Sequence, residues 1–118
     1  MKSAIRGKRG QKFLKELGEA MDRMSDKHLI AEMFEYEGSV CALGVVGKER
    51  GLDMSGMEDW DNDEVGELFG IAGALAAEIQ YMNDEYLWHG ANPEQRWNLV
   101  RRWIKENLKD DHNEVDDA

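Results

Sequence analysis

The chain is 118 residues long, carries a net charge of −10 and is 42% hydrophobic, which suits one domain with one core. No stretch approaches the roughly 20 apolar residues of a membrane-spanning helix, and the basic start lacks the apolar run of a secretory signal. The single cysteine, Cys41, excludes an internal disulfide and is typical of a reducing compartment, so we expect a cytoplasmic protein.

Charge alternates along the chain. Residues 1–15 hold six basic residues and no acid, residues 51–95 hold eleven acids and no Lys or Arg, and residues 96–109 hold five basic residues and one acid. An acidic protein repels nucleic acid and attracts basic proteins. We therefore expect direct nucleic-acid binding only through residues 2–15, and we expect residues 96–109 to pair with the acids of residues 51–95.

The ends of the chain differ from its middle. Residues 1–10 are rich in glycine and basic side chains, which predicts a mobile basic arm. Residues 11–109 are predicted to form a single helical domain, and residues 110–118, with five acids, a disordered acidic tail. Within the domain, apolar side chains recur every three or four residues from 11 to 24, which is typical of an amphipathic helix.

The next two segments are predicted helices of different character. Residues 28–37 fit a helix through Leu29, Ile30 and Met33, while 34–37 alternate like a strand. We favour the helix, with a short strand or hairpin in 28–37, and hence an α+β fold, as the alternative. Residues 39–50 are nearly uncharged and end before a glycine, which predicts a helix in the middle of the core.

Two capping signals mark the remaining helices. Asp61 and Glu64 have the spacing of a capping box before a helix over 62–82, and Asn92-Pro93 begins a helix over 93–108. The expected fold is therefore all-α, a compact bundle of four or five helices.

Three glycines repeat along one side of the 62–82 helix, at positions 66, 70 and 73. Each costs stability inside a helix, so the row predicts that another backbone packs closely against it. The 39–50 helix is the preferred neighbour, and a second copy of the chain, in a homodimer, is left open.

The stretch MEDWDNDEVGE, residues 57–67, combines six carboxylates with one tryptophan. It resembles an EF-hand calcium loop at its first acids, but the required glycine and the final glutamate are missing. A capped helix start explains several acids, and a tryptophan among carboxylates is typical of an interface anchor. The candidate partner-binding residues are Glu58, Asp59, Trp60, Asp61, Asp63, Glu64 and Glu67.

A catalytic alternative uses the same kind of residue. Glu32 and Glu35, like Glu64 and Glu67, have the ExxE spacing with which helical nucleotide hydrolases hold magnesium, and Asp84 is a candidate later ligand. We predict no cofactor, no catalytic residue and no specific metal site, and an enzyme remains the less favoured class.

Three stretches, VCALGVVG at 40–47, IQYMNDE at 79–85 and NPEQRW at 92–97, resemble a group of small proteins found in bacteria and in phages or prophages. The resemblance implies a phage or mobile-element context and no particular chemistry. It marks a shared feature, either core or site, that comprises Cys41, Asn83, Asp84, Arg96 and Trp97. From the residues themselves, Asn83 and Asp84 are suited to bind loop amides, Arg96 to pair with Asp84, and Cys41 to be a small buried hydrophobe.

The leading functional hypothesis is a small acidic binding protein that occupies a basic, nucleic-acid-binding surface of a host protein. An anti-CRISPR or anti-restriction inhibitor acts in this way. The alternatives are the metal-dependent nucleotide hydrolase and a nucleic-acid accessory protein that uses the basic arm.

Overall fold

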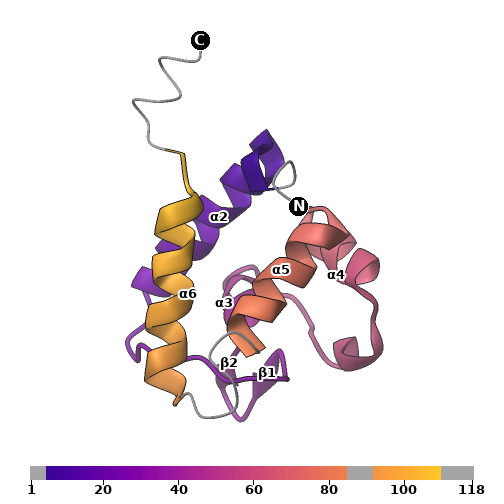
Figure 1. The fold of residues 1–118 in the computed structure, drawn as a ribbon. Helices are drawn as coiled ribbons and strands as arrows, with labels where there is room; N and C mark the ends of the chain where they lie inside the picture. Colours follow the sequence, from indigo (N-terminus) through magenta and orange to yellow (C-terminus); the bar gives the residue numbers. More distant parts are fainter. Residues whose placement is uncertain (1–4, 85–91, 110–118) are drawn as a thin grey trace.

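The computed structural model describes residues 5–84 and 92–109 (Figure 1). Within these residues the chain forms five helices of eight or more residues: α2 (Lys8–Asp22), α3 (Ala42–Glu49), α4 (Asn62–Phe69), α5 (Gly73–Asp84) and α6 (Pro93–Asn107). The other elements are a hairpin of β1 (Glu35–Tyr36) and β2 (Ser39–Val40), and the short 3₁₀ helix η1 (Met57–Asp59). The predicted helical fold class is confirmed.

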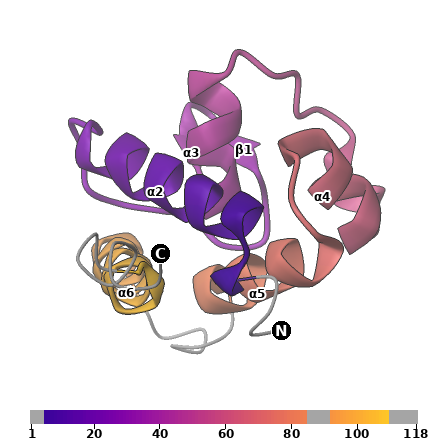
Figure 2. The same ribbon diagram turned by 90° about the horizontal axis from the view of Figure 1, so that it is seen from above.

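Four of the helices form a closed ring around the core. α2 packs on α3, α3 on α5, α5 on α6 and α6 on α2, while α4 packs against the outer side of α5 (Figure 2). α3 is buried along most of its length, because every residue from Ala42 to Gly47 is buried. The wholly buried side chains come from all four ring helices and include Leu14, Leu17, Leu43, Val46, Leu75, Ile79 and Ile104.

The first helix begins earlier than predicted, at Lys8 rather than at residue 11. Ile5 and Gly10 are buried and pack against the fold, whereas residues 6–9 are exposed. Gln11 explains why, because its buried amide donates to the carbonyl of Ile5 at 2.7 Å and to that of Asn107 at 3.0 Å. The predictions for residues 1–4 and 110–118 lie outside the described residues.

The preferred helix over 28–37 is wrong, and the alternative hairpin is correct. β1 pairs antiparallel with β2, Glu35 opposite Val40 and Tyr36 opposite Ser39. The two turn residues, Glu37 and Gly38, both have positive φ angles, 51° and 86°, as a tight hairpin turn requires. Backbone bonds from Ile30 to Val40 and from Cys41 to Phe34 extend this pairing. Since residues 39–40 are strand, α3 begins at Ala42 rather than at 39.

The single helix predicted over 62–82 is also wrong, because it is broken into α4 and α5. Gly70 has a φ of 77° and ends α4 in the left-handed conformation, and the Ile71 amide then bonds back to Gly66 at 2.9 Å. A side chain at Gly66 would meet the backbone of Ile71 to Gly73. Gly66 therefore packs against the turn between α4 and α5, Gly73 lies against Asp63 of α4, and Gly70 forms the turn itself; none of the three has α3 as its nearest neighbour.

The last helix was predicted well. α6 begins at Pro93, and Asn92 and Gln95 form the expected capping box, with bonds of 2.8 and 2.9 Å. It ends at Asn107, one residue before the predicted end.

Three ion pairs tie the ring helices together on the outside of the described fold: Arg23–Glu49, Arg50–Glu16 and Arg101–Asp22. Arg101 of α6 therefore pairs with α2, not with an acid of residues 51–95 as expected.

These pairs predict an acid-sensitive fold. The pKa values of Glu16, Asp22 and Glu49 lie below their ordinary values, because the paired guanidinium donates hydrogen bonds to each carboxylate. A lowered pKa in the folded state stabilises the fold above the unfolded pKa, about 4, and this stability is lost as the pH falls through the folded value. Urea unfolding should therefore show a falling free energy of unfolding from about pH 5 to about pH 3.

Asp22→Asn should weaken this pH dependence, since one of the three carboxylates no longer titrates. Asp26→Asn is the control, because Asp26 is exposed and outside the three pairs. Equal pH dependence in the wild type and in Asp22→Asn would contradict the assignment.

Candidate binding surface

The acidic stretch is held in place by its own hydrogen bonds. Before it, the Asp53 carboxylate accepts from the amide and the hydroxyl of Ser55 at 3.0 and 2.7 Å, and these donors lower the pKa of Asp53. Gly56 turns the chain with a φ of 80°, and the buried Met57 side chain anchors η1 to the core. The exposed residues that follow are therefore presented by a fixed backbone.

Helix α4 fixes the second half of the stretch. The predicted capping box is present: Glu64 N donates to the Asp61 carboxylate at 2.8 Å, and Asp61 N donates to the Glu64 carboxylate at 3.0 Å. The carboxylate of Asp63 lies against Gly73, the first residue of α5, where the positive end of the helix dipole favours an anion. Two further carboxylates, Glu58 and Asp59, have neither role.

All seven candidate partner-binding residues are exposed. We call this set the acidic face: Glu58, Asp59, Trp60, Asp61, Asp63, Glu64 and Glu67. Trp60 keeps 39% of its surface open to solvent, so it can contact a partner at this face. None of the three ion pairs found within the described residues uses an acid of this face. In Figures 1 and 2, α4 lies on the opposite side of the fold from α6.

The residues marked by the resemblance lie elsewhere, in a buried junction between α5, α3 and the segment before the hairpin. Asn83 accepts a bond from the amide of Ala42 at 2.9 Å and donates to the carbonyl of Ile30 at 2.9 Å and to Asp84 at 2.6 Å. Asp84 accepts from the amide of Glu32 at 3.0 Å. The prediction that Asp84 binds a loop amide is confirmed, whereas the amide that Asn83 binds is the first of α3.

The other marked residues complete this junction. Cys41 is buried, caps α3 by accepting from the Gly44 amide, and has its pKa raised to about 12 by burial, which is a structural and not a reactive thiol. Arg96 is buried and donates to the Leu29 carbonyl at 3.2 Å. Trp97 is buried beneath the ammonium group of Lys27, 5.4 Å from its ring centre.

The sequence analysis did not predict the irregular segment 29–34, whose backbone bonds to Asn83, Asp84 and Arg96. Glu32 has a φ of 70° there, which a residue with a side chain rarely adopts. The Asp84 carboxylate that binds its amide helps to hold that conformation. No local sequence signal identifies this segment, because its bonds run to distant residues.

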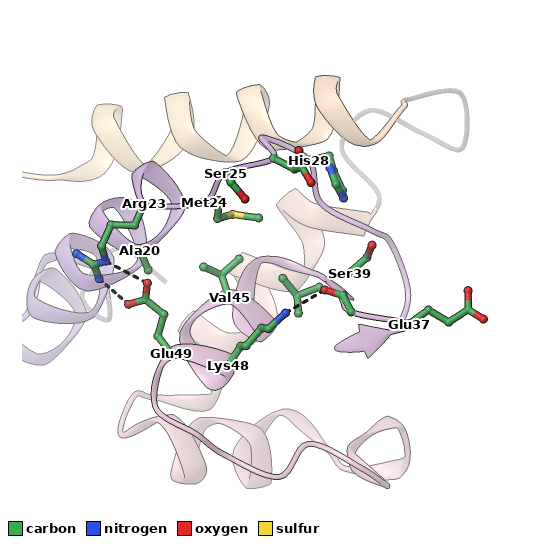
Figure 3. A pocket seen from close by; sticks show the side chains of 13 residues that line it. Ala20, Arg23, Met24, Ser25, His28, Glu37, Ser39, Val45, Lys48 and Glu49 are labelled. Atoms are coloured by element: carbon green, nitrogen blue, oxygen red, sulfur yellow. Dashed lines mark hydrogen bonds and ion pairs between the residues drawn. The ribbon is translucent and has the colours of Figure 1, made fainter.

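A groove of about 560 Å³ lies between the end of α2, the hairpin and α3 (Figure 3). Its main charged groups are already bonded within the chain, since Arg23 pairs with Glu49 and the Lys48 ammonium donates to the Gly38 carbonyl at 3.2 Å. His28 lines the groove without an acidic partner in the described residues. The groove does not include any residue of the acidic face.

The carboxylates proposed for metal binding are not brought together. Within residues 5–84 and 92–109, no group of three His, Cys, Asp or Glu side chains is placed to hold a metal ion. Glu64 and Glu67 lie on α4, while Glu32 precedes the hairpin and its backbone amide is bonded by Asp84 at the end of α5.

Comparison of the chain with protein-family models, with curated proteins and with solved structures gives no significant match in any of the three. In the part of the chain that the structure describes, no helix has the length and apolar character needed to cross a membrane.

Proposed function

We propose that this chain is a binding protein whose acidic face occupies a basic surface of another protein, of the kind that binds nucleic acid. The observation that supports this most directly is the exposed Trp60 within a fixed set of carboxylates that no described residue neutralises. Carboxylates at fixed spacing can replace the phosphates that such a surface normally contacts.

The local structure adds affinity in two ways. The capping box and the buried Met57 hold the acids before any partner arrives, which lowers the conformational entropy lost on binding. A tryptophan with a large exposed surface is the residue type that most often anchors a protein interface. The negative charge would speed the encounter with a basic partner.

The resemblance to phage proteins adds a narrower proposal. In a phage or mobile-element context, the partner would be a nucleic-acid-handling protein of bacterial defence, and the chain an inhibitor of the anti-CRISPR or anti-restriction type.

The test is capture from a bacterial lysate by the immobilised chain at low salt. We expect a nucleic-acid-binding protein to be retained, to be released by salt, and to be displaced by its own nucleic acid. The double variant Glu58→Gln, Asp59→Asn and the variant Trp60→Ser should each weaken the purified complex at least about tenfold. Glu58 and Asp59 take part in no ion pair of the described residues, so the double variant should unfold at the wild-type temperature. The unfolding temperature of Trp60→Ser is measured beside its affinity, because part of the Trp60 side chain is covered by the fold.

The control is Glu35→Gln with Glu106→Gln, which removes the same charge from exposed residues outside the acidic face. If the control weakened the complex equally, the loss of affinity would be explained by net charge and not by the acidic face. Retention of no nucleic-acid-handling protein at low salt would refute the proposal.

A further inference from the structure

A second charged surface lies between the start of α2 and the end of α6, and it has the opposite sign. It is a groove of about 580 Å³. We call it the basic groove, and six cationic residues line it: Arg6, Lys8, Lys12, Lys15, Arg101 and Lys109. Glu19 is the one acid among its lining residues. The two basic segments seen in the sequence thus meet in one place.

Five of these cations form no ion pair within the described residues. Arg101 is the exception, because it pairs with Asp22 at 2.8 Å and its guanidinium lies beside Gly18. The charge of Arg101 is therefore neutralised, and its side chain lines the groove beside Gly18. The other five are exposed and take part in none of the ion pairs of the described residues.

The groove is built on a rigid support. Gln11 is buried below it and bonds to the carbonyls of Ile5 and Asn107 and to the amide of Lys109, the last at 2.8 Å. These bonds fix the backbones next to Arg6 and at Lys109 beside α2.

The helix itself adds to the positive field. Lys8, Lys12 and Lys15 follow one another at steps of four and three along one side of α2, over about 10 Å at 1.5 Å per residue. The first turn of α2 contains no acid, and Gly7 provides no side-chain cap. The positive end of the helix dipole is therefore reinforced by cations instead of being neutralised.

We propose that the basic groove binds the phosphate backbone of duplex nucleic acid, without sequence preference. Lysine ammonium groups contact phosphates as point charges, and a cluster of four lysines with Arg6 suits a polymer with a regularly repeated negative charge. The lining includes no aromatic side chain on which an unpaired base could stack, which favours a duplex over a single strand. This binding is independent of the acidic face, and a chain with both surfaces could contact a protein and its nucleic acid together.

The experiment is fluorescence anisotropy with a labelled duplex of mixed sequence and the full chain, over a range of salt concentrations. Five phosphate contacts predict that log K falls with log salt with a slope of about −4.5. Lys12→Glu with Lys15→Glu should weaken binding at least about tenfold at low salt and flatten this slope by about 2. Lys12→Gln with Lys15→Gln should give a smaller loss in the same direction.

The matched control is Arg102→Glu with Lys105→Glu, which makes the same change in net charge on exposed residues of α6 outside the groove. Binding close to wild type in this control and loss in the α2 variant would support the proposal. Equal loss in both, or no duplex binding by the wild type at low salt, would overturn it. Polyglutamate that displaces the duplex at equal charge would overturn it in favour of an acidic protein ligand.

Discussion

Gly44→Ala should lower the free energy of unfolding by about 3 kcal/mol, at the upper end of what overpacking a core costs. Gly44 lies in the middle of α3, and a Cβ there would overlap the carbonyl oxygen of Phe34 and lie 2.9 Å from the Cβ of Val40. Neither neighbour can move easily, because the Phe34 carbonyl accepts the Cys41 amide and Val40 belongs to β2. The hairpin would therefore have to move away from α3 to make room for the methyl group.

Gly18→Ala is the matched control for this prediction. Gly18 is also buried within a helix, α2, but its nearest neighbours are side-chain atoms, the Arg101 guanidinium and the Cγ2 methyl of Ile104, at 3.3 Å and not at overlap distance. Alanine should cost little there, because its better helix propensity of about 1 kcal/mol offsets a small shift. Chemical unfolding measures both variants, and an equal effect at the two glycines would contradict the contact assigned to Phe34.

Asn83→Leu should cost a similar amount, about 3 kcal/mol, for a different reason. Leucine has about the same size but leaves the Ala42 amide and the Ile30 carbonyl without their partners in a buried junction. It also removes the amide that donates to Asp84, which holds the Glu32 backbone. Hydrogen exchange at the Ala42 and Glu32 amides should accelerate more than at the centre of α6.

Asn98→Leu provides the comparison, since Asn98 is exposed on α6 and bonds only to the carbonyl of Glu94 in its own helix. We expect its free energy of unfolding to change by no more than about 0.5 kcal/mol. A loss at position 83 as small as that at position 98 would mean that the junction does not hold the segment before the hairpin.

The parts of this fold that were predicted correctly depend on neighbours in the sequence. The capping boxes at Asp61 and Asn92 are read from residues three positions apart, and their hydrogen bonds are made within the same turn. The apolar repeat of α2 is equally local. Such signals need no knowledge of the rest of the chain.

The errors come from contacts between distant residues. Residues 28–34 have helical spacing, but their backbone bonds go to Val40, Asn83 and Arg96. The hydrogen bonds to those residues outweigh the weak preference of this segment for a helix. The error at Gly70 has a different origin. A glycine at this position is compatible both with a continuing helix and with a helix end, and the packing of α5 on α4 decides for the helix end.

The candidate surfaces were predictable to different degrees. The acids of residues 58–67 are visible in the sequence, but which apolar side chain of this stretch is buried, Met57, and which is exposed, Trp60, is not. The basic groove could not be predicted as one surface, because its two halves lie about 90 residues apart and meet through Gln11.

Gln11 has one more consequence, for the connectivity of the chain. Its side chain touches the backbone at Ile5 and at Lys109, so the first and last parts of the described fold lie within reach of one residue. A short linker could therefore join position 109 to position 5, and new ends could be opened in the exposed turn at Ser55 and Gly56. The ring of four helices would keep all its contacts in such a circular permutant, because its packing does not depend on where the chain starts.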